Sequence, residues 1–298
     1  KKLVGKRNPG DFDFRSHFSR QGSYGRLFID KKHDSIIHQG NLPFIISRIR
    51  STQTFVRNSL NNATDPKTAG LLTALLLGDK STIDENMKLD FANTGVIHVL
   101  AVSGLHVGYI LIILTIFASI IRIPWGWNRV VIILGLFAFC ALTGGKPSVV
   151  RASIMAGLYV ISPIVNRPGN IWNIIGFAAC LLLAYDPLYI KGLGFILSFS
   201  AVISIIYFYG LFEKLLPEAI NPTHIQNSFL KNTLSLFLVS LSAQIGTLPI
   251  TAAFFHKIPI ISLVANVIIV PIIGVIVVVG FMIIALSFSP FLSVSAGK

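Results

Sequence analysis

Seven long apolar runs follow one another between residues 96 and 288, and they restrict the possible folds more than any other feature. A helix needs about 20 apolar residues to cross a bilayer. Only 12% of the chain is charged, whereas soluble domains carry about 25%. The sequence therefore predicts an all-α polytopic membrane protein with about seven transmembrane helices. The predicted spans are residues 96–122, 129–142, 147–165, 171–185, 189–212, 231–249 and 258–288.

Some of these spans are expected to be short or broken. The second and fourth runs are too short for a full crossing, so they are expected to be tilted into protein or incomplete. The last run contains Pro271, and Pro249 ends the run before it. Because proline removes one backbone hydrogen bond and clashes with the preceding turn, a break or kink is expected at each proline.

The N-terminal third differs from the rest. Residues 1–40 are polar, basic and weakly alternating, which indicates a partial OB-like β segment at the end of a soluble domain. Residues 41–95 are expected to form amphipathic helices in the membrane interface, and residues 96–298 the transmembrane domain. For the helix over residues 42–60, the alternative is packing on the protein's own core.

Acidic residues are rare in the transmembrane part. Residues 96–298 contain ten Lys and Arg but only Asp186, Glu213 and Glu218 as acids. This balance suits a polyanionic partner. The alternative is that the cations only anchor helix ends at lipid headgroups. Charges of the loops divide almost evenly between the two sides, so they do not determine the orientation.

No metal or cofactor is expected. Cys140 and Cys180 each lie within an apolar run, as small packing residues do. No Cys-x-x-Cys or paired-histidine spacing occurs.

Polar residues interrupt the apolar runs at four places, and such places indicate function in a membrane protein. At the first, Ser103, Gly104 and His106 favour a helix break. The alternative, a serine bonded to its own helix and a packing glycine, leaves the deep histidine unexplained.

At the second place, "LTGGKPSVVRAS", Gly144 and Gly145 stop one helix and Pro147 can begin the next. Lys146 and Arg151, with the free amides of that helix start, form a candidate phosphate-contact site. A tight turn with snorkelling cations is an equal alternative. The motif is not a Walker sequence, because the spaced first glycine and the preceding strand are missing.

The third and fourth places contain Gln244 before Pro249 and Asn266 before Pro271. Amides within spans usually bridge helices, and that structural role is favoured.

Five stretches together resemble the ComEC-type competence protein family. They are "NPGDFDFRSHFSRQGSYGRLF", "VIHVLAVSGLHVGYI", "LTGGKPSVVRASIMAG", "YDPLYIKGLGFILSFSAVISI" and "AQIGTLPITAAFFHKIPIISLVANVIIVPI". The resemblance implies the competence domain of an inner-membrane DNA-uptake channel, preceded by the end of an OB-like domain. It also implies single-stranded DNA as a partner, together with other competence-machinery proteins and a possible homo-oligomer. The metallo-β-lactamase-like nuclease domain of many members is absent from this sequence.

The residue pattern and the family resemblance together predict a channel in the cytoplasmic membrane, and not an enzyme. Ser103, Gly104, His106, Gln244 and Asn266 are the candidates for lining the DNA path, because weak neutral donors bind phosphate without trapping it. Two alternatives stay open. One is a small-solute transporter with broken helices, for which an internal repeat is lacking. The other is an intramembrane hydrolase using Ser103 and His106, which lacks an orienting carboxylate within any span.

Overall fold

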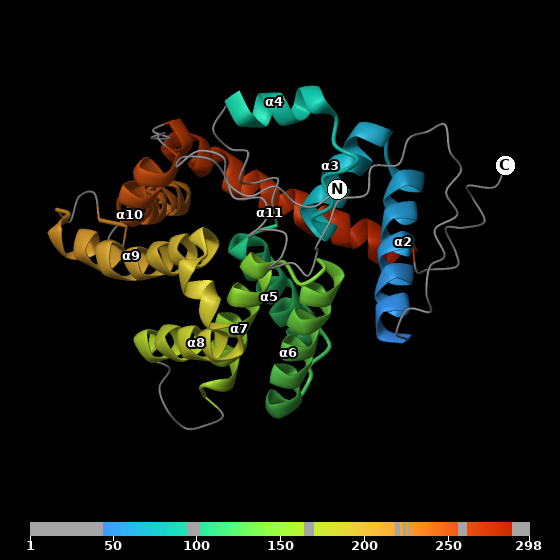
Figure 1. Ribbon diagram of the computed structural model, residues 1–298, viewed down its shortest axis with the longest axis horizontal. Helices are drawn as coiled ribbons and strands as arrows, with labels where there is room; N and C mark the ends of the chain where they lie inside the picture. Colours follow the sequence, from blue (N-terminus) through green and yellow to red (C-terminus); the bar gives the residue numbers. More distant parts are fainter. Residues whose placement is uncertain are drawn as a thin grey trace. The chain divides into compact units, whose positions relative to one another are not determined.

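The computed structural model describes residues 44–93, 102–163, 170–217, 221–222, 225, 227–255 and 261–287. The chain divides into two compact units, residues 1–44 and 45–298, so all described residues after Phe44 belong to the second unit. All regular structure within the described ranges is helical. The helices are α2 (Phe44–Ala63), α3 (Pro66–Leu77), α4 (Glu85–Asn93), α5 (Gly104–Ile120), α6 (Trp125–Leu142), α7 (Pro147–Ile161), α8 (Ile171–Tyr185), η2 (Pro187–Lys191), α9 (Leu193–Leu215), α10 (Ser228–Phe255) and α11 (Ile261–Ser287) (Figure 1).

Helices α5 to α11 occupy the seven predicted spans, one helix in each. Three of them, α9, α10 and α11, are long and apolar enough to cross a membrane, and α5 to α8 are shorter apolar helices. The all-helical class is confirmed for the described residues, whereas the count of seven crossings stays a prediction. The predicted OB-like segment over residues 1–40 lies outside the described residues.

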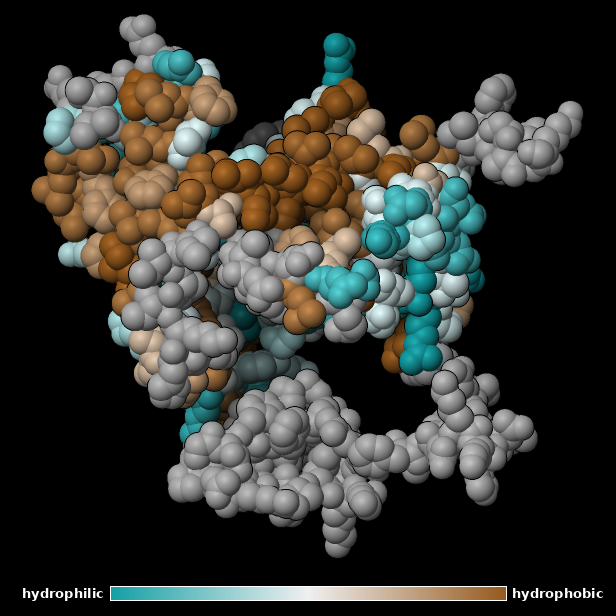
Figure 2. All heavy atoms as spheres, turned by 90° about the horizontal axis from the view of Figure 1, so that it is seen from above, coloured by the Kyte–Doolittle hydropathy of each residue, from teal (hydrophilic) through white to brown (hydrophobic). Residues whose placement is uncertain are grey.

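Three hydrophobic clusters connect these helices. The first joins the second half of α2 to α3 and α11, through buried residues such as Leu60, Leu76 and Val277. The second joins α5, α6 and α7. The third lies between α7, α8 and α9, around Ile175 and Phe199. Outside these clusters, many large apolar side chains of α5 to α11 are exposed. Figure 2 shows them as a broad hydrophobic band, while hydrophilic residues gather where α2 lies. Such a surface is typical of a protein whose outer face meets lipid.

Helix α2 packs on the protein through its second half and exposes apolar side chains at its start. Val56 and Leu60 are buried in the first cluster, so its second half packs on the protein. Phe44 and Ile45 at its start are 71% and 72% exposed. These two side chains leave an apolar surface that can enter a membrane interface.

Five helices contact one another in a closed order. Helix α5 contacts α7, α7 contacts α9, α9 contacts α10, α10 contacts α11, and α11 contacts α5. We call these five helices the helix ring. Helix α6 packs on α5 and α7, and α8 packs on α7, so both lie outside this closed order.

Two prolines lie inside ring helices. Helices α10 and α11 continue through Pro249 and Pro271, so the predicted helix breaks at these residues do not occur. Each proline lacks the N–H that would bond the carbonyl four residues earlier, that of Ile245 or Val267, and the two hydroxyl contacts near the prolines go to other carbonyls. Close to Pro271, the Tyr109 hydroxyl of α5 donates to the Val270 carbonyl at 2.6 Å. Close to Pro249, the Thr247 hydroxyl donates to the Ala243 carbonyl at 2.8 Å.

Candidate functional site

Helix α5 begins at Gly104, at the position where the sequence predicted a break. Ser103 precedes it with extended backbone, and its N–H donates to Nδ1 of His106 at 3.2 Å. The Ser103 Oγ lies 3.3 Å from the same Nδ1. His106 thus takes the third position of a capping box, which usually holds Glu or Gln. The polar residues of "SGLH" therefore begin a helix inside an apolar run.

His106 is 1% exposed and packs inside the protein beside Val102 and Val107. Because its Nδ1 accepts the Ser103 N–H, its Nε2 carries the proton. This Nε2 is buried and has no hydrogen-bond partner among the described residues. The side chain therefore acts locally, as a cap.

The turn between α6 and α7 depends on two glycines. Gly144 and Gly145 have φ values of 72° and 64°, a left-handed conformation that glycine adopts without strain. The Thr143 hydroxyl donates to the Phe139 carbonyl at 3.0 Å and so satisfies the end of α6. Pro147 occupies the first turn of α7, where its missing N–H costs nothing. The turn therefore has the form that the sequence predicted.

Lys146 extends from this turn to the end of α3. Its Nζ donates to the carbonyl of Gly78, the left-handed residue that ends α3. A cation at a helix C-terminus is favoured by the helix dipole. Two residues later, the Ser148 hydroxyl donates to the Val102 carbonyl at 2.9 Å, just before α5. The α6–α7 turn thus connects the end of α3 to the start of α5.

Helix α2 joins the same region through two polar contacts. Gln53 Nε2 donates to the Leu142 carbonyl of α6 at 2.7 Å. Arg57 forms an ion pair with Asp79, which follows α3. A hydrogen bond from Ser81 lowers the pKa of Asp79, and the charges of Arg57 and Lys146 lower that pKa further.

We call this region, where helix ends meet, the polar junction. The C-termini of α3 and α6 and the N-termini of α5 and α7 converge there. Its members are Gln53, Arg57, Gly78, Asp79, Val102, Ser103, Leu142, Lys146 and Ser148.

Arg151 lies one turn beyond Lys146 but contacts different neighbours. It is 7% exposed, and its guanidinium lies against Gly194 at the start of α9. It lines a cavity of only about 10 Å³ with Tyr189, Phe195 and three other residues of this region. Its Nε has no hydrogen-bond partner among the described residues. The structure therefore does not bring Lys146 and Arg151 together.

Gln244 and Asn266 lie on two ring helices. Gln244 of α10 has a partner within the protein. Asn266 of α11 is seven residues before Ile273 and so shares its face. The Asn266 Oδ1 is buried and has no hydrogen-bond partner among the described residues.

The sequence did not single out Tyr109, whose hydroxyl joins α5 to α11. Its position in an apolar run could have indicated this contact, because a buried tyrosine hydroxyl usually finds a hydrogen-bond partner. The partners Gln53, Asp79 and Ser148 had no such signal, since each contacts a residue far away in the sequence. Among the residues that the structure describes, no group of three His, Cys, Asp or Glu could hold a metal ion.

These observations define a helical membrane protein with a closed order of five helices and a polar junction of helix ends. The chain belongs to the Competence protein family, whose model matches residues 75–297.

Three relatives extend this result. The chain is 30% identical over 268 residues to ComE operon protein 3 of Bacillus subtilis (strain 168), covering 88% of this chain and 32% of that protein. It is 31% identical over 189 residues to an uncharacterized protein of Aquifex aeolicus (strain VF5), covering 63% and 41%. It is 26% identical over 218 residues to the uncharacterized protein YcaI of Escherichia coli (strain K12), covering 70% and 28%. The chain thus spans less than half the length of these relatives. No solved structure matches it.

Proposed function

We propose that this chain is the membrane part of a channel that passes single-stranded DNA across the cytoplasmic membrane during natural transformation. The family and the name of the Bacillus relative support a role in competence. The observation that carries the proposal is the helix ring, because a closed order of contacts is the arrangement that can surround a path.

The distribution of charge supports a polyanion in that path. Between Asp90 and Asp186 the sequence contains no acid, but it contains Arg122, Arg129, Lys146, Arg151 and Arg167. A carboxylate there would repel phosphate, whereas scattered cations attract it. Two of these cations lie at the start of α7, a ring helix: Lys146 is its N-cap, and Arg151 lies in its first turns.

Neutral polar groups on the ring helices suit a path that DNA passes through without being held tightly. Gln244 and Asn266 are amides within α10 and α11, and each can contact a phosphate or a base with a neutral hydrogen bond. A path must bind its cargo strongly enough for entry and weakly enough for exit. Gly104 adds close packing at the ring, since a Cβ there would lie 3.4 Å from the Cβ of Ala152 on α7.

We propose no enzymatic step for this chain. The Ser103 and His106 pair has the geometry of a helix cap, and its only close ring nitrogen, Nδ1, already accepts a backbone N–H. A serine nucleophile needs a base that is itself oriented by a third group.

The same proposal places the start of α2 in the outer membrane interface, next to incoming DNA. Ser51 and Asn58 of α2 are exposed. Cysteines at these positions should react with an impermeant thiol reagent that is added to intact spheroplasts. Labelling only after lysis would show the opposite orientation.

Other competence proteins, a nuclease domain or chain, and a second copy of this chain are the partners that this function would require. Each is part of the proposal.

The experiment that tests the channel is a steric block at Gly108. Nothing lies within 4 Å of a Cβ built at Gly108, which is one turn after Gly104 on the ring helix α5. A side chain at Gly108 has room at its Cβ, and we propose that it enters the path, so Gly108→Trp should reduce DNA uptake at an unchanged protein level. The matched control is Gly176→Trp on α8, outside the ring, where a Cβ also meets nothing within 4 Å.

Uptake is measured as radiolabelled DNA in a nuclease-resistant form, and protein in the membrane is measured by immunoblotting. We expect Gly108→Trp to lower uptake at least about tenfold at an unchanged protein level, and Gly176→Trp to leave uptake unchanged. Normal uptake in both variants would contradict the proposed path. Gly104→Leu is a poorer test, because that side chain would press on Ala152 and disturb packing.

A further inference from the structure

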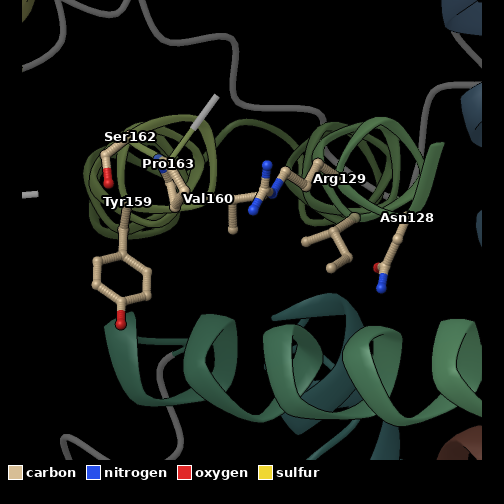
Figure 3. A pocket seen from close by; sticks show the side chains of 7 residues that line it. Asn128, Arg129, Tyr159, Val160, Ser162 and Pro163 are labelled. Carbon is tan, nitrogen blue, oxygen red and sulfur yellow. The ribbon is translucent and has the colours of Figure 1, made fainter. Parts of the chain in front are cut away.

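A cavity of about 430 Å³ lies between the start of α6 and the end of α7. Four polar residues line it, namely Asn128 and Arg129 from α6 and Tyr159 and Ser162 from α7 or its C-cap. Figure 3 shows the Arg129 guanidinium extending between the two helices towards Val160, with Tyr159 and Asn128 on either side. Volumes of this size are typical of small-ligand sites.

The cavity is separate from the polar junction. Helices α6 and α7 form a hairpin, and the junction includes Leu142 and Lys146 at its turn. The cavity lies at the open ends of the same two helices. A ligand there would contact Arg129, one of the cations between Asp90 and Asp186, but none of the residues of the polar junction.

The residues around the cavity indicate headgroup depth in a membrane. Trp127, next to Asn128 and Arg129, is 67% exposed, and Arg122 lies in the preceding turn. Exposed tryptophan together with arginine is typical of the membrane–water interface. Ile132, which is 5% exposed, adds an apolar side chain to the lining. The cavity thus offers a polar mouth beside a lipid-facing surface.

The lining favours an anion that also carries a hydroxyl group. Among the described residues of the lining, Arg129 is the only charged one, and a guanidinium matches a phosphate with two parallel hydrogen bonds. The hydroxyls of Tyr159 and Ser162 can donate to phosphate oxygens. The Asn128 Oδ1 is buried without a hydrogen-bond partner among the described residues, and it requires a donor.

We propose that this cavity binds the phosphoglycerol headgroup of an anionic phospholipid. The phosphodiester would lie against Arg129, and a glycerol hydroxyl would donate to Asn128. A phosphocholine headgroup has no O–H or N–H donor and carries a compensating positive charge. The cavity therefore discriminates between the two headgroups. Basic pockets between the helices of membrane proteins are known to bind anionic lipid headgroups at the membrane surface.

The test uses the purified chain in nanodiscs that contain equal amounts of phosphatidylglycerol and phosphatidylcholine with identical acyl chains. Native mass spectrometry measures which lipids stay bound after release from the disc. We expect phosphatidylglycerol to be retained about tenfold over phosphatidylcholine, because only phosphatidylglycerol donates a hydroxyl to Asn128 and lacks the positive charge that opposes Arg129.

Arg129→Gln should remove this preference, and Arg122→Gln is the matched control, because Arg122 lies at the same end of the hairpin without lining the cavity. If Arg129→Gln fails to fold, Asn128→Leu should lower the preference several-fold, because it removes the acceptor of the glycerol hydroxyl.

Equal retention of both lipids by the unaltered protein would overturn the proposal. An equal loss of the preference for phosphatidylglycerol in Arg122→Gln and Arg129→Gln would also overturn it. Displacement of the lipid by soluble glycerol phosphate at millimolar concentration would reassign the cavity to a free phosphate ester. Displacement by a single-stranded oligodeoxynucleotide would reassign it to DNA. Either displacement overturns the lipid assignment.

Discussion

Gly246 on α10 packs directly against α9. A Cβ built at Gly246 would overlap the Cβ and Oγ of Ser204 and would lie 3.3 Å from the Ser200 carbonyl oxygen. The Ser200 hydroxyl also donates to the Gly246 carbonyl at 2.7 Å. Small residues at such contacts allow membrane helices to approach closely. We therefore predict that Gly246→Ala separates α9 from α10 and destabilises the protein.

The magnitude depends on two opposing effects. Inserting a methyl group into a tight contact costs about 1–3 kcal/mol. Alanine in place of glycine within a helix gains about 1 kcal/mol. At Gly176 on α8 a Cβ meets nothing within 4 Å, so Gly176→Ala should show only the gain. The two variants should therefore differ by about 1–3 kcal/mol, with Gly246→Ala the less stable.

The assay is thermal unfolding of the purified protein in detergent. A difference of about 1–3 kcal/mol corresponds to roughly 2–12 °C in Tm for a chain of this order of size. Ser204→Gly removes the atoms that the new methyl group would meet, so it should suppress the effect of Gly246→Ala in the double variant. Equal Tm values for Gly246→Ala and Gly176→Ala would refute the close α9–α10 contact. Additive losses in the double variant would do the same.

Three further predictions concern the polar junction and the ring. Asp79→Asn should remove part of the acid sensitivity of unfolding. The pKa of Asp79 is lowered in the folded state, so its contribution to stability is present above the unfolded pKa, about 3.9, and is lost as the pH falls through the folded pKa. The measurement is Tm between about pH 6 and pH 3, and identical profiles for the variant and the unaltered protein would contradict the prediction. Gly144→Ala should cost about 1 kcal/mol because φ is 72°, while Gly144→Asn should cost less; denaturation of both variants checks the order. Tyr109→Phe should lose about 0.5–1.5 kcal/mol with the hydrogen bond to Val270, and an unchanged Tm would show that this bond does not hold α5 on α11.

Features that depend on neighbouring residues could be predicted from the sequence. The start of α5 at Ser103 and Gly104 results from a cap within three residues, and the α6–α7 turn results from Gly144, Gly145 and Pro147. Capping and glycine conformation act within a turn of the chain. Their local character explains why the pattern alone was enough.

Contacts between distant residues could not be predicted in this way. The sequence offered a phosphate contact or a snorkelling cation for Lys146 and did not indicate its partner in the fold, the Gly78 carbonyl, which lies 68 residues earlier in the chain. Pro271 was expected to break or kink its helix, and α11 continues through it without a break, beside the Tyr109 hydroxyl. Both outcomes depend on how helices pack, and tertiary packing overrides local preference. For the same reason, the docking of α2 through Val56 and Leu60 could only be one of two alternatives.

The most direct test of the DNA path is to capture a strand inside the helix ring. A photoreactive phenylalanine derivative is placed at Gly108 on α5 or, as the control, at Gly176 on α8, and cells are irradiated during uptake of labelled DNA. We expect a protein–DNA adduct at Gly108 that a single-strand-specific nuclease digests, and no adduct at Gly176. Adducts of equal yield at the two positions, or none at Gly108 while transformation continues, would contradict a DNA path through this ring.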